Sequence, residues 1–359
     1  MSDFLAQLQQ INFANIVAFL SPTIIYFVAK EPIVSNYKLV KDFKVNSVKP
    51  VALPVEVIKK YDEIDEKKVL EKRFGELIID FAKVVNEKIP EFNWSIFLNN
   101  LNTLKTGTKS FKLSNFIYNK NTEGDYSPAS NTIRLSEHNY RITITHELFH
   151  VATTIYDRAH GIIFCGFEQV RGNSTIGEGI NEGYTQYLAE KTFGKENTLG
   201  TAYTYEKRIA EVLENIVGGE KMRSLYFNAD LSGLIEYLKM YTSEESIHKF
   251  INTLDFLNEH MGDKFLLPSS KKLINESCKS VNVFLLQTAL RKKIIDSNDS
   301  TISTKDLLDE LIPIMTLIPA HVKNKEKSSD IFDEELILDA LSDVINEYDL
   351  SDDNTKITK

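Results

Sequence analysis

Cysteine is scarce in this sequence, since only Cys165 and Cys278 occur among 359 residues. The two lie too far apart in the chain to form a paired metal-binding motif, and a disulfide between them would depend on the fold bringing them together. So few cysteines in so long a chain are typical of a reducing compartment. We therefore expect a cytoplasmic protein.

Basic runs and internal repeats are also missing. The net charge is −9, and no stretch is rich enough in lysine and arginine to form the basic patch that nucleic-acid binding requires. We therefore expect no nucleic-acid partner. Apolar residues make up 42% and charged residues 26% of the chain, which is the balance of a soluble globular protein. Its length is sufficient for two domains or one large one.

Charged side chains are absent from residues 4–29. Within this stretch, residues 11–29 approach the length of a membrane span, but polar residues and Pro22 interrupt them, and no lysine or arginine precedes them as in a secretory signal. The segment predicts a buried helix that ends near Ser21 and a strand from Thr23, because proline breaks helices. A membrane anchor through residues 11–29 is the alternative.

Residues 146–150 read His-Glu-Leu-Phe-His. On a helix, residues four apart share a face, so His146 and His150 can present two imidazoles to one point. Two imidazoles at this spacing suit a tetrahedral zinc ion, and Glu147 is placed to act as general base on a water that the ion activates. The β-branched residues 141–145 lead in, and the apolar residues 151–156 predict that the helix continues and is buried. The alternative is an ordinary helix with two exposed histidines.

A catalytic zinc site needs a third protein ligand. The metzincin pattern would require a histidine at Tyr156, so it fails. His160 lies ten residues after His150, which is too far for the metzincin spacing. Asp157 would lie on the same helix as the histidines and point away from the metal.

A better candidate for this ligand lies downstream, where residues 181–184 read Asn-Glu-Gly-Tyr. This segment resembles the N-E-G-aromatic signature of the gluzincin metallopeptidases. In that family the glutamate of the signature is the third zinc ligand, carried on a second helix packed against the first. The resemblance therefore implies that Glu182 binds the zinc.

Glu178 competes with Glu182 for this role. The pattern Thr175-x-x-Glu178 is that of a capping box, which explains Glu178 as part of a helix start instead. Gly179 and Gly183 would permit close backbone approach where two helices share one metal. Gln186, one turn after Glu182, stands where thermolysin-like enzymes carry an aspartate, and its amide can still hold a ligand histidine.

The resemblance covers residues 115–200 approximately, and the gap from His150 to Glu182 is longer than in thermolysin-like enzymes and aminopeptidases. We expect its extra residues, 157–174, to form a loop over the cleft. The resemblance implies an α+β fold with a zincin-like catalytic domain. We predict an N-terminal segment (1–60), the catalytic core (61–200), a helical subdomain (201–323), and a linker, acidic helix and tail (324–359).

Apolar periodicity and turn residues predict the other elements. We expect helices over residues 62–88, 94–104, 175–190, 203–217, 231–241, 243–260, 271–295, 304–318 and 331–348. Strands are expected over residues 34–45, 111–119 and 131–135, with a turn-rich segment over 119–130 between the last two. In zincins an edge strand of the sheet runs along the cleft and pairs with the peptide, but the sequence does not indicate which strand does so here.

The resemblance implies a zinc metallopeptidase that acts on a peptide or protein substrate. Gluzincins stabilise the oxyanion with a tyrosine or histidine. Of the nearby tyrosines, Tyr184, Tyr203, Tyr205 and Tyr237, we favour Tyr205 as this donor because it begins the next helix. A core tyrosine at the start of that helix is the stronger alternative. The G-x-M-E-N element of aminopeptidases is missing, which favours an endopeptidase. A zinc hydrolase of a non-peptide amide or ester, and a non-catalytic zincin-like binding protein, remain as alternatives.

Overall fold

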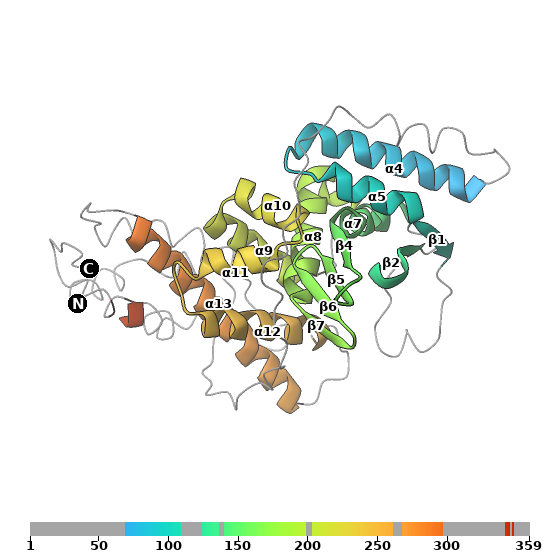
Figure 1. The fold of residues 1–359 in the computed structure, drawn as a ribbon. Helices are drawn as coiled ribbons and strands as arrows, with labels where there is room; N and C mark the ends of the chain where they lie inside the picture. The colour runs from blue at the N-terminus through green and yellow to red at the C-terminus, as the bar shows by residue number, and fades with distance from the viewer. Residues whose placement is uncertain are drawn as a thin grey trace.

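The computed structural model describes residues 69–108, 124–135, 140–198, 203–260 and 268–296, together with 342–344 and 347. These residues form a mixed α+β fold in which helices predominate and two small sheets lie near the middle of the chain (Figure 1). The strands expected over 34–45 and 111–119 and the helix expected over 304–318 lie outside the described residues.

Two N-terminal helices, α4 (Val69–Lys88) and α5 (Trp94–Thr103), lie beside helix α7 (Tyr140–Thr153) (Figure 1). The helical spacing of apolar residues in α4 buries Phe81, whose ring packs edge-on against Phe149 of α7 at 5.1 Å between centroids. Helix α5 begins at Asn93, whose side chain accepts a hydrogen bond from the backbone N–H of Ile96. Both helices were predicted from the sequence, and together they cover one side of α7.

The first sheet has the strand order β1-β3-β2, with β1 parallel and β2 antiparallel to the central strand. Its strands are β1 (Lys105–Thr108), β2 (Gly124–Ser127) and β3 (Thr132–Leu135). Strand β3 matches the strand predicted over 131–135. Strand β2 lies inside the segment predicted as turns, which was therefore wrong for these four residues.

Helix α7 ends earlier than the apolar pattern predicted. It includes the β-branched residues 141–145, but it stops at Thr153, and Thr154–Asp157 form strand β4. The side-chain amide of Asn100 donates to the carbonyls of Val151 and Thr154 at 2.7 Å each, which satisfies the end of the helix. Asp157 is consequently in a strand and not on the helix as expected.

The segment between α7 and the next helix is a sheet rather than a loop. Four antiparallel strands follow one another in the order β4-β5-β6-β7. After β4, their bounds are β5 (Ile162–Cys165), β6 (Glu168–Arg171) and β7 (Ser174–Ile176). The turns at Gly161 and Gly172 have φ of 64° and 60°, which glycine adopts without strain.

Helix α8 (Glu178–Phe193) begins at Glu178, the last residue of the predicted capping box, and not directly after Thr175. Thr175 lies in β7, and the residue before the helix is Gly177, which has no side chain to act as a cap. Instead, the carboxylate of Asp255 accepts hydrogen bonds from the backbone N–H groups of Gly177 and Gly179 at 2.8 Å each. The cap therefore comes from another helix, which a local pattern does not reveal.

Residues 203–260 and 268–296 are mostly helical as predicted, and of the helix expected over 331–348 the structure describes only residues 342–344 and 347. The first two ranges contain α9 (Thr204–Val217), α10 (Gly219–Phe227), α11 (Leu231–Leu238), α12 (Glu244–His260) and α13 (Pro268–Asp296). Helix α10 was not expected, because no helix was predicted between residues 217 and 231. Gly218, with φ of 94°, does end α9, but Gly219 begins the next helix at once.

Gly179 and Gly183 of α8 allow other helices to approach closely. These helices are α12 and α9, whereas the sequence suggested close approach to the histidine helix α7. A Cβ at Gly179 would lie 2.6 Å from the backbone oxygen of Leu254 in α12, and a Cβ at Gly183 would overlap the backbone oxygen of Glu206 in α9. Helices α9 and α12 therefore pack against the faces of α8 that carry Gly183 and Gly179. The face of α8 that carries Glu182 is left for α7.

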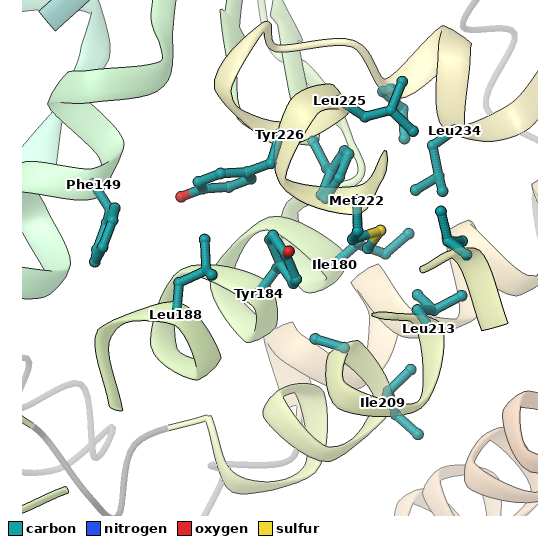
Figure 2. Close-up of a cluster of buried hydrophobic side chains, with 14 of the residues drawn as sticks. Phe149, Ile180, Tyr184, Leu188, Ile209, Leu213, Met222, Leu225, Tyr226 and Leu234 are labelled. Atoms are coloured by element: carbon teal, nitrogen blue, oxygen red, sulfur yellow. The ribbon is translucent and has the colours of Figure 1, made fainter. Parts of the chain in front are cut away.

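One hydrophobic core joins the predicted catalytic and helical regions. Figure 2 shows part of it, where Phe149 of α7, Leu188 and Tyr184 of α8, and Tyr226 of α10 gather. The same cluster of buried residues extends from α4 to α13. The cluster includes residues on both sides of residue 200, where the catalytic core was predicted to end.

Within the described part of the chain, every helix is too short or too polar to cross a bilayer. Residues 11–29, for which a membrane contact was the alternative, lie outside it.

Candidate metal centre

Helices α7 and α8 bring three side chains to one point. The Nε2 atoms of His146 and His150 are 3.0 Å apart. The carboxylate of Glu182 lies 3.0 Å from Nε2 of His146 and 3.4 Å from Nε2 of His150. Both histidines are buried, and Glu182 is largely covered. The structure thus groups the three residues that the sequence indicated as metal ligands.

These separations suit a tetrahedral metal ion. Two ligand atoms that each lie 2.0–2.1 Å from a zinc ion in tetrahedral geometry are about 3.3 Å apart. The two Nε2 atoms are 3.0 Å apart, and the nearest carboxylate oxygens are Oε2 of Glu182 at 3.0 Å from His146 and Oε1 at 3.4 Å from His150. The group can hold a metal ion, and its two imidazoles and one carboxylate are a donor set that zinc accepts.

The hydrogen bonds of His146 direct its lone pair to this point. The amide of Gln186 donates through Nε2 to Glu190 at 3.0 Å, so its Oε1 atom faces Nδ1 of His146 at 3.1 Å. Because Oε1 can only accept, Nδ1 carries a hydrogen, which leaves Nε2 as the ring atom available to a metal. Gln186 therefore holds the ligand histidine, as the sequence suggested for this position.

His150 has a different neighbour. Its Nδ1 atom lies 3.6 Å from Sγ of the buried Cys165 and 3.4 Å from Nδ2 of Asn181. The Oδ1 atom of Asn181 accepts from the N–H of Phe167, which turns the donor side of this amide toward His150. A ring that offers its Nε2 lone pair to a metal carries its hydrogen on Nδ1. The thiol sulfur of Cys165 is the neighbour that can accept that hydrogen.

Within the group, opposite charges stabilise one another against the effect of burial. Burial disfavours the charged form of Glu182, but His150 and His146 outweigh burial and hold the pKa of this carboxyl well below its usual range. Burial likewise opposes the charged form of His150, yet Glu182 and Cys165 raise the pKa of this imidazole well above its ordinary value. Both shifts reflect the attraction between the Glu182 carboxylate and the imidazoles beside it.

Glu147 lies on α7 beside the group and is 5% exposed. Burial raises the pKa of its carboxyl, and the negative charges of Glu182 and of Asp125 in β2 add to this effect against the attraction of both histidines. A carboxylate with a raised pKa is better suited to accept a proton near neutral pH than an exposed one. Its position and its environment fit the general base that the sequence predicted.

Tyr205, which the sequence favoured as the oxyanion donor, directs its hydroxyl to helix α13. Its hydroxyl is buried and donates to the backbone oxygen of Cys278 in α13 at 3.2 Å. Its neighbour Tyr203 instead stacks on the ring of His146, with centroids 5.4 Å apart and planes 11° apart. The charge of Glu182, burial and a hydrogen bond to Glu182 raise the pKa of Tyr203 well above its ordinary value, so its hydroxyl keeps its proton.

The backbone at the start of α9 explains why Tyr203, and not Tyr205, contacts His146. Tyr203 has a left-handed conformation, with φ of 49° and ψ of 38°, and precedes the first residue of the helix. This conformation turns its side chain toward α7, whereas Tyr205 is already helical and faces the core. A strained backbone of this kind is not visible in a sequence.

The other acidic and histidine candidates lie elsewhere. Glu178 is exposed at the first position of α8 and does not belong to the group. His160 is exposed in the turn after β4, where its ring contacts the carboxylate of Asp157 at 2.6 Å. Sequence reasoning missed Cys165 as a partner of His150, because the strand that carries it was expected to be a loop.

Comparisons with protein-family models, with curated proteins and with solved structures found no match to this chain.

Proposed function

We propose that this protein is a zinc-dependent metallopeptidase. The observation that carries the proposal is the meeting of His146 and His150 from one helix with Glu182 from a second, at separations that fit one metal ion. Glu147 stands between the two histidine positions in sequence and on the same buried helix. This combination of three ligands and an adjacent carboxylate is the equipment for hydrolysis by an activated water.

Zinc in this group would supply Lewis acidity, which makes water nucleophilic near neutral pH and polarises a carbonyl. The carboxylate of Glu147 takes a proton as the water attacks the scissile carbonyl and later delivers it to the leaving amine. Gln186 and Cys165 hold His146 and His150 in the orientations described above. The burial of the group limits competing water around these charges.

Tyr203 is the oxyanion donor in this proposal. Its ring is fixed against His146, and its hydroxyl lies within hydrogen-bonding reach of Glu182. A protonated hydroxyl beside a ligand can donate to the negative charge that develops on the carbonyl oxygen. Its interaction with Glu182 keeps the hydroxyl near the reacting carbon before the substrate arrives.

Strand β2 supports a peptide as the substrate. It is the outer, antiparallel strand of its three-stranded sheet, next to β3. At Gly124 it lies so close to α7 that a Cβ there would overlap the methyl group of Thr143, one turn before His146. Among the described strands, β2 pairs with β3 alone, and an extended peptide can pair with the outer edge of such a strand through backbone hydrogen bonds. The same strand carries Asp125, whose charge raises the pKa of Glu147.

Peptide cleavage by the zinc-loaded full-length chain tests the proposal. Denatured proteins and a mixed peptide library would be incubated with the wild type and with Glu147→Gln, and the products identified by mass spectrometry. We expect internal cleavage by the wild type alone. Zinc-bound protein that hydrolyses amide or ester compounds but no peptide would contradict the peptidase assignment, and a zinc-bound protein without hydrolysis would point to a binding role.

A further inference from the structure

We infer that Glu190, paired with Lys207, is a positioning residue that acts on the ligand His146 through the amide of Gln186. This inference rests on the proposed metal centre. Lys207 contacts both carboxylate oxygens of Glu190 at 2.8 Å, and one of these oxygens accepts from Nε2 of Gln186 at 3.0 Å. The Oε1 atom of Gln186 then accepts from Nδ1 of His146 at 3.1 Å. Every link is a hydrogen bond of ordinary length.

The chain of contacts follows from the helical repeat. Glu182, Gln186 and Glu190 are spaced four apart on α8, so a ligand, the group that holds a ligand, and a charge lie along one face. Lys207 reaches this face from the first turn of α9. The backbone N–H of Lys207 bonds to the carbonyl of Tyr203 at 2.8 Å, so the residue that stacks on His146 and the residue that pairs with Glu190 belong to one turn.

The carboxylate of Glu190 compensates for the weaker effect that the Gln186 amide has on His146. A histidine that binds a metal through Nε2 can donate a hydrogen bond from Nδ1. A neutral amide that accepts this hydrogen bond raises the basicity of Nε2 less than a carboxylate does. Gln186 is fully buried, and both partners of the Glu190–Lys207 pair are mostly covered, at 15% and 12% side-chain exposure. In such surroundings a charge polarises the hydrogen bonds connected to it. Glu190 therefore fixes the orientation of the Gln186 amide and strengthens its acceptor oxygen.

The same two helices contain a second ion pair that serves as a control. Lys191 of α8 bonds to Glu214 of α9, so this pair also ties α8 to α9 and is largely buried on the carboxylate side. Glu214 accepts in addition from the hydroxyl of Tyr184 at 2.6 Å. The hydrogen bonds of the Glu214 carboxylate thus come from Tyr184, Tyr187 and Lys191, and none of these is a candidate ligand. Loss of its charge should affect stability without affecting the metal.

Zinc affinity of the full-length chain tests the inference through competition with a chromogenic chelator. We expect Glu190→Gln to weaken zinc binding by about 10-fold or more, as removal of an outer hydrogen-bond partner does at other zinc sites. Glu214→Gln should lower the melting temperature but leave zinc affinity within about 2-fold of wild type. In the double variant Gln186→Glu with Glu190→Gln, a carboxylate contacts His146 directly, and affinity should recover.

A second readout follows His146 itself. The Nδ1–H proton of His146, observed by NMR in the zinc-loaded protein, should move upfield in Glu190→Gln and stay in place in Glu214→Gln. An equal loss of zinc affinity in Glu190→Gln and Glu214→Gln would show that Glu190 has only a structural role, and would overturn the inference. Unchanged zinc affinity in Glu190→Gln would also overturn it. A wild type that binds no zinc would instead overturn the proposed function, and the positioning role with it.

Discussion

The ring of Tyr203 lies flat against the imidazole of His146, with 5.4 Å between their centroids. Four residues later, Lys207 reaches the same imidazole indirectly, through Glu190 and Gln186. The first turn of α9 therefore supports one ligand histidine on its ring face and at its Nδ1 atom. A helix that sequence reasoning placed in a separate subdomain contributes directly to the candidate centre.

The roles of the two neighbouring tyrosines can be separated by removing each hydroxyl. Tyr203→Phe should lower kcat for peptide cleavage by about 100-fold, because one donor to the oxyanion is lost. Tyr205→Phe should leave kcat nearly unchanged and lower stability by about 1 kcal/mol, because it loses one buried hydrogen bond to α13. Steady-state kinetics and denaturant unfolding measure the two effects. The opposite pattern would restore Tyr205 as the oxyanion donor.

Glu147→Gln separates metal binding from proton transfer. The change keeps the size of the side chain and removes its ability to take a proton, so peptide cleavage should fall by at least about 100-fold. Zinc content should stay the same, since Glu147 is not one of the three grouped ligands. The comparison requires elemental analysis and cleavage rates on the same preparations. An active Glu147→Gln protein would remove this residue from the proposed mechanism.

The ligand group was predictable because its signals are local. His146 and His150 need only a helical repeat, and the residues around Glu182 form a short signature on one helix. The long amphipathic helices were predictable for the same reason. A buried face imposes a regular spacing on apolar residues, and that spacing is visible in the sequence.

The supporting residues were harder to predict because they depend on distant parts of the chain. Asp255 caps α8 from a helix 76 residues away from Gly179, so the local capping pattern was misleading. The end of α7 is fixed by Asn100, which lies 51 residues before Val151. Strands of four residues, such as β2 and β4, give too short an alternation to separate them from turns or from the end of a helix.

Gly183 is required by the contact between α8 and α9. Alanine normally favours a helix by about 1 kcal/mol over glycine, but a Cβ here would overlap the backbone oxygen of Glu206. Gly183→Ala should therefore destabilise the protein by about 1–3 kcal/mol. Gly107→Ala is the control, since its Cβ would lie 3.5 Å from Cγ of Arg134, an ordinary contact. Equal stability of the two variants in denaturant unfolding would show that α8 and α9 can move apart freely.

Glu206 should make the stability of the metal-free protein depend on pH. Burial, against a backbone hydrogen bond and with some help from Glu182, raises the pKa of its carboxyl from 4.5 to about 7. Between these values the unfolded carboxyl has lost its proton while the folded one keeps it. The free energy of unfolding therefore falls as pH rises from 4.5 to 7, by on the order of 3 kcal/mol.

Glu206→Gln removes this titration. The variant should gain stability relative to wild type at pH 8 and gain little at pH 4, as measured by denaturant unfolding after metal removal with a chelator. The same difference in the free energy of unfolding between wild type and variant at both pH values would show that Glu206 ionises normally in the folded protein.

Metal content of the purified full-length chain tests the central claim most directly. Elemental analysis would compare the wild type with Glu182→Gln and Glu178→Gln, each after zinc is added and excess is removed. We predict about one zinc per chain in the wild type and in Glu178→Gln, and a clear loss in Glu182→Gln, because Glu182 meets both histidines while Glu178 is exposed. A wild type without zinc, or zinc lost only in Glu178→Gln, would contradict the metal centre described here.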